Sequence, residues 1–233
     1  MPTHPPTPKP PPRLRLPPNA PPKTPRPKPR PDVPPSSRIP TDDLTLNLSD
    51  AGVSATADIE LIFDQQHLDR IVREGLLRAR VSLDIATADL KTMLIPTGRS
   101  SRANSTLHEL ARMARNGIEV RLLHSGVPTG PVLHELRDGL PRALTIRRCP
   151  RLHAKLIVVD TQAMYLGSAN LTGAGLGAKS ANRRNFELGM RTHSAKLIES
   201  VQEWYNTIWE GARCATCRRR NICPVPLEEP NLT

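Results

Sequence analysis

One apolar stretch in the second half of the chain constrains the fold most strongly. Residues 152–159 are almost all apolar, and the two polar side chains among them, His153 and Lys155, stand two positions apart. A continuous apolar run of this length predicts a strand that is buried on both faces. Because side chains alternate between the two faces of a strand, His153 and Lys155 are expected on the same face.

The residues that follow predict a turn and a partner strand. Residues 160–162 have turn chemistry, and residues 164–166 are typical of a second strand that ends at Gly167. Ser168 and Asn170 therefore fall at a strand end, where the backbone can approach a ligand closely.

Together these polar side chains form a receptor for a phosphoryl group. Lys155 offsets charge on the non-bridging oxygens, and Ser168 and Asn170 donate hydrogen bonds. His153, in its neutral form, attacks phosphorus as the nucleophile. This chemistry predicts no catalytic metal.

The spacing H-x-K-x4-D-x6-G-S-x-N, from His153 to Asn170, resembles the signature of the phospholipase D superfamily. Residues 185–189 are similar to the strand that follows this signature in the family, and the resemblance covers roughly residues 56–211. The chain carries one copy of the signature. In this it resembles the short nuclease branch, in which two identical subunits build one site.

The resemblance implies a reaction shared between two subunits. His153 of one subunit forms a phosphohistidine, and His153 of the other protonates the leaving oxygen and then activates water. Glu187 matches the acidic residue that holds the histidine tautomer. Asp160 has two alternatives, which are pairing with a cation across the site and capping a turn.

Helical and strand patterns alternate through the rest of the chain. Helices are predicted around residues 68–79, 107–114, 132–137 and 197–208, and further strands at residues 81–86, 118–123 and 144–147. This alternation around an apolar strand pair predicts an α/β fold with a mixed sheet flanked by helices. The resemblance implies the same phospholipase D-like fold. His124 and Ser125 lie at the end of one of these strands, where the alternatives are facing the site and a role in a turn, and the turn is favoured.

Composition divides the chain into three parts. Residues 1–40 hold 18 of the 26 prolines and +7 of the formal net charge of +11, which predicts a disordered basic arm that acts as a tether or docks a partner protein. Residues 41–211 form the catalytic domain, and residues 212–233 form a cysteine-containing tail. Without a secretory signal or a membrane-spanning apolar run, a soluble cytoplasmic protein with no membrane partner is expected.

Cationic side chains flank the motif on both sides. Those before it are Arg147, Arg148 and Arg151, and those after it are Lys179, Arg183 and Arg184. They form either a solvated face or a phosphate track. The basic arm favours the track, with DNA or RNA as substrate. Because aromatic residues make up only 3% of the chain, recognition of the nucleic-acid backbone is expected rather than base stacking.

Two alternatives to a nuclease stay open at this stage. One is a phospholipase, which the absence of an amphipathic membrane helix with an aromatic edge disfavours. The other is a non-catalytic nucleic-acid-binding subunit of a larger complex, such as a bacterial defence system against invading DNA.

The four cysteines predict a further site. Cys214, Cys217 and Cys223 follow C-x2-C-x5-C, and Cys149 lies far upstream. In a cytosolic chain this spacing favours metal over disulfides. It resembles the iron–sulfur staple of certain unrelated DNA-processing nucleases, in which a 4Fe-4S cluster ties the C-terminus to the body. Tetrahedral zinc and free thiols are the alternatives, and either metal would be structural.

Overall fold

A computed structural model of the chain describes residues 45–48, 53–56, 58–96, 103–128, 130–137 and 139–229. The basic arm predicted for residues 1–40 lies outside the described residues. No helix in the described part of the chain is both long and apolar enough to cross a membrane.

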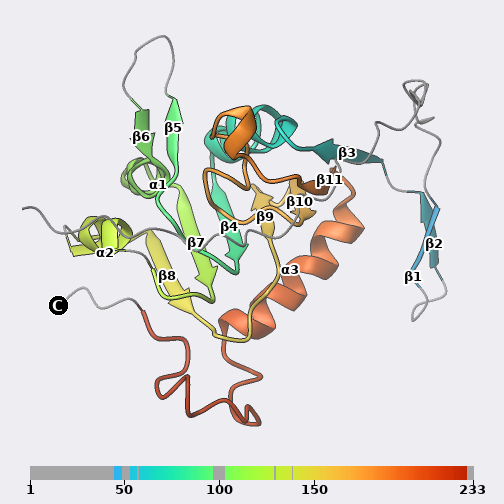
Figure 1. The fold of residues 1–233 in the computed structure, drawn as a ribbon. Helices are drawn as coiled ribbons and strands as arrows, with labels where there is room; N and C mark the ends of the chain where they lie inside the picture. The colour runs from blue at the N-terminus through green and yellow to red at the C-terminus, as the bar shows by residue number, and fades with distance from the viewer. Residues whose placement is uncertain are drawn as a thin grey trace, which may run out of the picture. The chain divides into compact units, whose positions relative to one another are not determined.

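Seven strands form one mixed sheet in the order β3-β11-β10-β9-β4-β7-β8 (Figure 1). Their bounds are β3 Ile59–Phe63, β4 Ser82–Thr87, β7 Glu119–His124, β8 Leu144–Arg148, β9 Leu156–Val159, β10 Ala163–Gly167 and β11 Leu188–Thr192. Strands β4, β7 and β8 are parallel, whereas every pairing from β4 through β9 to β3 is antiparallel. Two separate hairpins pair β1 (Thr45–Leu48) with β2 (Val53–Thr56) and β5 (Leu94–Pro96) with β6 (Ala103–Ser105).

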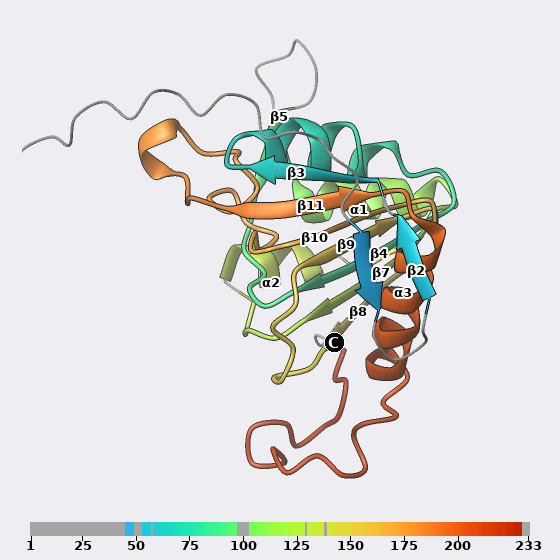
Figure 2. The ribbon, with the colours of Figure 1, turned by 90° about the vertical axis from the view of Figure 1, so that its right-hand side faces the viewer.

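Helices cover both faces of the sheet, as the alternating sequence patterns predict (Figure 2). The α-helices are α1 Thr106–Arg115, α2 Gly130–Arg137 and α3 Ala195–Trp209. A π-helical segment, His67–Arg73, precedes them in the chain. Along β9, Leu156 and Val158 pack with α3, whereas Ile157 packs with α1, α2 and the π-helical segment. Strand β9 is therefore buried on both faces, and the predicted α/β fold with a mixed sheet flanked by helices is confirmed.

Two predicted elements are shorter than their sequences indicate. The helix expected over residues 68–79 is a π-helical segment followed by a single 3-10 turn, Leu76–Arg78. The break falls at Gly75, where a Cβ atom would lie 2.5 Å from the carbonyl oxygen of Ile71. The strand expected over residues 152–159 begins only at Leu156, because a turn closed by the hydrogen bond from the Leu152 amide to the Cys149 carbonyl (2.9 Å) precedes it.

An aromatic ring fixes the spacing of the two strands that follow β9. The Tyr165 side chain of β10 lies across two glycines, Gly167 and Gly189, which face each other in the β10–β11 register. A Cβ atom at Gly167 would lie 2.7 Å from Tyr165 Cζ, and one at Gly189 would lie 2.8 Å from the same atom. Both positions therefore need glycine because the ring occupies the space of a side chain.

Gly189→Ala tests this packing. The added methyl group must displace the buried Tyr165 ring, so we expect the free energy of unfolding in urea to fall by about 1–3 kcal/mol, as for other overpacked cores. Gly130→Ala is the matched control, since no atom lies within 4 Å of its Cβ position. Equal stability of the two variants would contradict the packing argument.

Candidate active site

The sheet brings most polar residues of the motif to one edge, formed by the ends of its central strands. Strand β10 ends where β9 and β11 begin, and the parallel strand β4 ends at the same edge. Two backbone hydrogen bonds extend the ladders there, from the Gly167 amide to the Lys155 carbonyl (3.1 Å) and from the Ser168 amide to the Leu188 carbonyl (3.0 Å). The side chains predicted for catalysis, Asp160 excepted, therefore come from neighbouring strand ends.

His153 and Lys155 lie in the extended segment just before β9. The His153 side chain is exposed, whereas Lys155 is buried beneath it. The Lys155 ammonium donates to the His153 carbonyl (2.8 Å) and lies 3.3 Å from His153 Nδ1. Burial lowers the pKa of Lys155, and the nearby Glu187 carboxylate opposes that shift. The cation is thus held within contact of the predicted nucleophile.

Ser168 and Glu187 are hydrogen-bonded to each other. The Ser168 hydroxyl donates to the Glu187 carboxylate and accepts from the Leu188 amide (3.1 Å). The second carboxylate oxygen of Glu187 accepts from the Asn185 amide group (2.9 Å). Within one chain, Glu187 is therefore held by these neighbours, and the hydrogen bonds of the described residues do not join it to His153.

Asn170 contacts the loop that follows β4. Its Oδ1 atom accepts from the backbone amides of Ala88 (3.1 Å) and Asp89 (3.2 Å). With this oxygen bonded to the loop, the Nδ2 group is the hydrogen-bond donor of this side chain. Asn170 thus also ties the end of β4 to the end of β10.

Asp160 does not lie with the other predicted catalytic residues. It stands at the opposite end of β9 from His153, roughly 20 Å away along an extended chain. Its carboxylate accepts from the backbone amides of Val81 (2.8 Å) and Ser82 (2.9 Å). Of the two predicted alternatives, the turn is the one that the hydrogen bonds support, and its assignment to the catalytic set is corrected.

A buried histidine, His67, belongs to a hydrogen-bond network beside the site. His67 donates from Nδ1 to the Asp64 carbonyl (2.8 Å), and its Nε2 accepts from the Tyr165 hydroxyl (3.0 Å). Burial lowers the pKa of His67 and raises that of Tyr165 to about 12, so both stay neutral near pH 7. The Tyr165 oxygen in turn accepts from the Ala169 amide (3.3 Å), which fixes the turn between Ser168 and Asn170.

Sequence reasoning missed this network. His67 stands 86 positions before His153 in a segment with no motif, and only the fold places it against Tyr165. His124, predicted in a turn, is instead the last residue of β7, and its Nδ1 atom hydrogen-bonds to the Gly126 carbonyl (2.9 Å). Its Nε2 atom is buried without a hydrogen-bond partner, and burial lowers its pKa.

Two of the predicted substrate-binding arginines are occupied within the chain. Arg148 pairs with Glu228 (2.6 Å) and donates to the Ser125 carbonyl (3.2 Å). Arg147 stacks on the Trp209 ring at 4.7 Å and donates to the Trp209 carbonyl (3.0 Å). Arg147 also pairs with Glu229, so both arginines of β8 contact the C-terminal tail, and their place in a phosphate track stays a prediction.

The other three predicted arginines differ in position. Arg151 is exposed beside His153 and hydrogen-bonds to the Cys217 thiol. The pKa of Cys217 is lowered, first by a hydrogen bond with the backbone of Arg219 and then by the hydrogen bond with Arg151. Arg183 is exposed at the end of a 3-10 turn, Ala181–Arg183, and Arg184 follows it, half-buried, before β11. None of the three is in an ion pair among the described residues.

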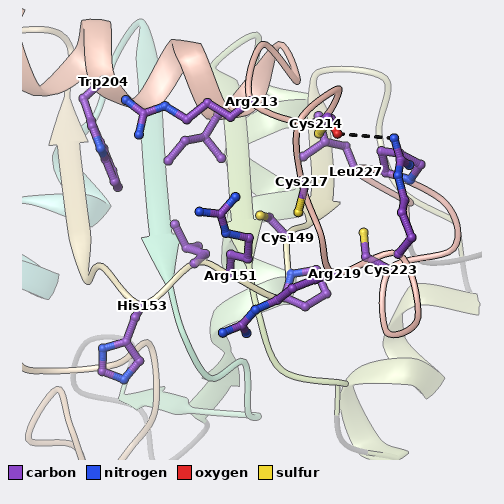
Figure 3. A pocket seen from close by; sticks show the side chains of 15 residues that line it. Cys149, Arg151, His153, Trp204, Arg213, Cys214, Cys217, Arg219, Cys223 and Leu227 are labelled. Carbon is purple, nitrogen blue, oxygen red and sulfur yellow. Dashed lines mark hydrogen bonds between the residues drawn. The ribbon is translucent and has the colours of Figure 1, made fainter.

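The four cysteines line one cavity next to His153 (Figure 3). All are free, and burial together with the neighbouring Cys149 and Cys223 thiols raises the pKa of Cys214. Among the described residues, however, no group of three or more His, Cys, Asp or Glu side chains is arranged to hold a metal ion. The arrangement therefore does not fit the predicted iron–sulfur or zinc staple, and the arginine contacts above hold the tail.

This mixed sheet, with a histidine and a lysine before one strand and a serine and an asparagine after the next, defines a protein of the phospholipase D class. The family described as "Cardiolipin synthase, PLD-like domain" matches residues 57–209, which is more than half of the chain. The chain belongs to this family, and the predicted membership of the phospholipase D superfamily is confirmed.

Comparison with solved structures gives similar chains of low sequence identity. NucT from Helicobacter pylori is 18% identical with a TM-score of 0.48, and the match covers 65% of this chain and 95% of that one. Nuc from Salmonella typhimurium, described as a phospholipase D family member, is 16% identical with a TM-score of 0.48, over 65% of this chain and 93% of that one. No curated protein sequence matches the chain.

Asp160→Asn separates a structural role from a catalytic one. The neutral amide keeps the positive φ of 53° that asparagine tolerates but weakens charge-assisted acceptance from the three backbone amides of Arg80, Val81 and Ser82, so we expect a loss of about 1–2 kcal/mol in unfolding free energy. The rate of phosphodiester hydrolysis per folded molecule should stay within about twofold, because the carboxylate lies far from His153. Loss of activity at unchanged stability would return Asp160 to the catalytic set.

Proposed function

We propose that this protein is a metal-independent nuclease that hydrolyses phosphodiester bonds of DNA or RNA through a phosphohistidine in a homodimeric site. The single observation that carries the proposal is the buried Lys155 ammonium held against the exposed His153 at the sheet edge. Family membership supports a phosphodiesterase, and the net charge of +11 supports a polyanionic substrate.

The chemistry follows from the positions of the side chains. A neutral His153 attacks phosphorus, its new N–P bond forms as the bond to the leaving oxygen breaks, and a proton must reach that oxygen. Lys155 stabilises the charge on the non-bridging oxygens, and Asn170 lies at the same end of the strands, as does Ser168, whose hydroxyl donates to Glu187. Water then attacks the phosphohistidine, gives up its proton to the general base, and releases His153.

A second subunit supplies what one chain lacks. In-line displacement needs a nucleophile and an acid on opposite sides of phosphorus, and the motif supplies one histidine per chain. An exposed apolar patch beside Glu187 supports this proposal. Its members are Leu61, Phe63, Phe186 and Leu188, of which Phe186 is 96% exposed. Exposed patches of this kind mark association surfaces, and Phe63 and Leu188 are direct neighbours in the β3–β11 register.

His153→Ala tests the catalytic assignment. Removing the nucleophile should lower cleavage of labelled single- and double-stranded DNA and RNA by at least about 10⁴-fold, while binding persists on the unchanged cationic surface. Wild-type cleavage should continue in EDTA. Wild-type turnover by the variant would refute the nucleophile, and strict dependence on added Mg²⁺ would refute the metal-independent mechanism. Hydrolysis of phospholipid vesicles but not of nucleic acid would assign the phospholipase alternative.

Phe186→Ser tests the dimer. Removing the exposed ring should raise the dimer dissociation constant in sedimentation by about tenfold or more, as for aromatic anchors of interfaces, and lower activity at dilute protein. Val81→Ser is the matched control, because this apolar side chain is 68% exposed just before β4, at the end of the strands opposite to His153. A fully active wild-type monomer would contradict the shared site.

The pH dependence of hydrolysis tests Lys155. Since burial lowers its pKa from 10.5, activity should fall as pH rises through a value below 10.5. Between the pKa of Lys155 in the folded chain and its pKa in the unfolded chain, the unfolded chain binds more protons, so the contribution of Lys155 to stability rises with pH. The loss of activity in this pH range is therefore not caused by unfolding through this group. Lys155→Arg should move the alkaline limb to higher pH, because a guanidinium stays protonated. An unchanged limb would exclude Lys155 as its origin.

A further inference from the structure

A cavity opens beside His153, between α3, the turn before β9 and the C-terminal tail (Figure 3). Its volume is about 180 Å³. Pockets for drug-sized ligands measure about 300–1,000 Å³, so this cavity has room for one ring system rather than for a lipid chain. The predicted nucleophile forms part of its wall, which places any occupant next to the reacting phosphorus.

The acidic and basic side chains that line the cavity are all basic. Four arginines line it, Arg151, Arg213, Arg219 and Arg220, and its lining contains no aspartate or glutamate. The acidic residues that follow in the tail, Glu228 and Glu229, pair instead with Arg148 and Arg147. Within the cavity, Arg220 donates to the Cys214 carbonyl (3.3 Å) and Arg151 hydrogen-bonds to the Cys217 thiol. Since none of the four arginines is paired with a carboxylate among the described residues, they keep their positive charge for an anion, and guanidinium groups match phosphate geometry.

The wall between α3 and the turn is apolar and includes an indole ring. Trp204 of α3 lines the cavity with Leu152 and Ile208, and it is half-buried rather than closed into the core. Figure 3 shows its ring projecting from the helix towards the side of the cavity on which His153 lies. A flat π-surface beside arginines is the combination on which unpaired bases stack.

We infer that this cavity binds one unstacked nucleotide of the substrate strand, next to the bond that His153 cleaves. The base stacks on Trp204, and the flanking phosphates pair with Arg213, Arg219 and Arg220. This inference rests on the proposed function and narrows its substrate to single-stranded or locally unpaired nucleic acid. Base stacking, which the low aromatic content disfavours as the main source of binding, thus has one specific place.

Trp204 variants of the full chain test the stacking contact. In a His153→Ala background, which prevents cleavage, labelled single-stranded and duplex oligonucleotides of one sequence are titrated. Trp204→Leu should weaken single-strand binding about 5- to 150-fold, the loss for one stacked base, and leave duplex binding within about twofold. Trp204→Phe, which keeps a π-face, should restore most of the affinity. Equal losses on both substrates, or none, would overturn the inference.

Variants of the cavity arginines are tested in the same binding titrations, with a neighbouring arginine as the matched control. The double variant Arg219→Gln, Arg220→Gln removes two cavity cations, and should flatten the logarithmic salt dependence of single-strand binding by about 1.4, or 0.7 per phosphate contact. Arg218→Gln removes a neighbouring exposed cation that does not line the cavity, and should change the slope by less than half as much. Equal slopes per charge for the two variants would show that the cavity has no special role.

The remaining outcomes separate this inference from the proposed function. If the wild type cleaves nucleic acid and both sets of variants bind normally, the cavity assignment fails and the nuclease stands. If the wild type neither cleaves nor binds nucleic acid but binds anionic phospholipid vesicles, both fail. Stoichiometric iron or zinc in the protein purified without oxygen would place a metal among the four thiols and overturn the nucleotide site.

Discussion

The packing of Tyr165 across Gly167 and Gly189 is the constraint on which the site depends. The ring holds β10 and β11 at the separation that places Ser168 beside Glu187, and its hydroxyl joins His67 to the turn that carries Asn170. The glycine of the G-S-x-N motif thus has a physical reason that is independent of any ligand. A side chain at either glycine would push the ring out and shift the strand ends that carry the polar groups.

The site also depends on the edge of the sheet at which parallel and antiparallel strands meet. Parallel strands β4 and β7 end there, and antiparallel strands β9 and β11 begin there, so chain segments far apart in sequence contribute to one surface. Burial of Lys155 in this edge keeps its cation beside His153 in an environment of low polarity. Electrostatic stabilisation of developing charge is stronger in such an environment than in water.

Local sequence predicted those parts of the structure that local patterns determine. The motif residues His153, Lys155 and Ser168 could be named because their spacing resembles the family signature and also agrees with strand period and turn chemistry, and α1 and α3 follow from apolar periodicity. Asp160 was ambiguous because a turn carboxylate and a catalytic carboxylate have the same sequence signature. The roles of Arg147 and Arg148 could not be predicted, because they depend on where Glu228 and Glu229 return to the sheet. For the same reason, only the folded tail places its arginines beside His153.

The central claim is that His153 forms a covalent bond to phosphorus, and trapping that bond tests it most directly. The wild-type protein is mixed with an oligonucleotide carrying ³²P at the scissile phosphate, quenched in alkali where phosphohistidine survives, and digested for mass spectrometry. The account predicts an acid-labile phosphoryl adduct on the peptide that contains His153, formed in the presence of EDTA and absent from His153→Ala. An adduct on another residue, or rapid EDTA-sensitive cleavage with no adduct at any time point, would contradict it.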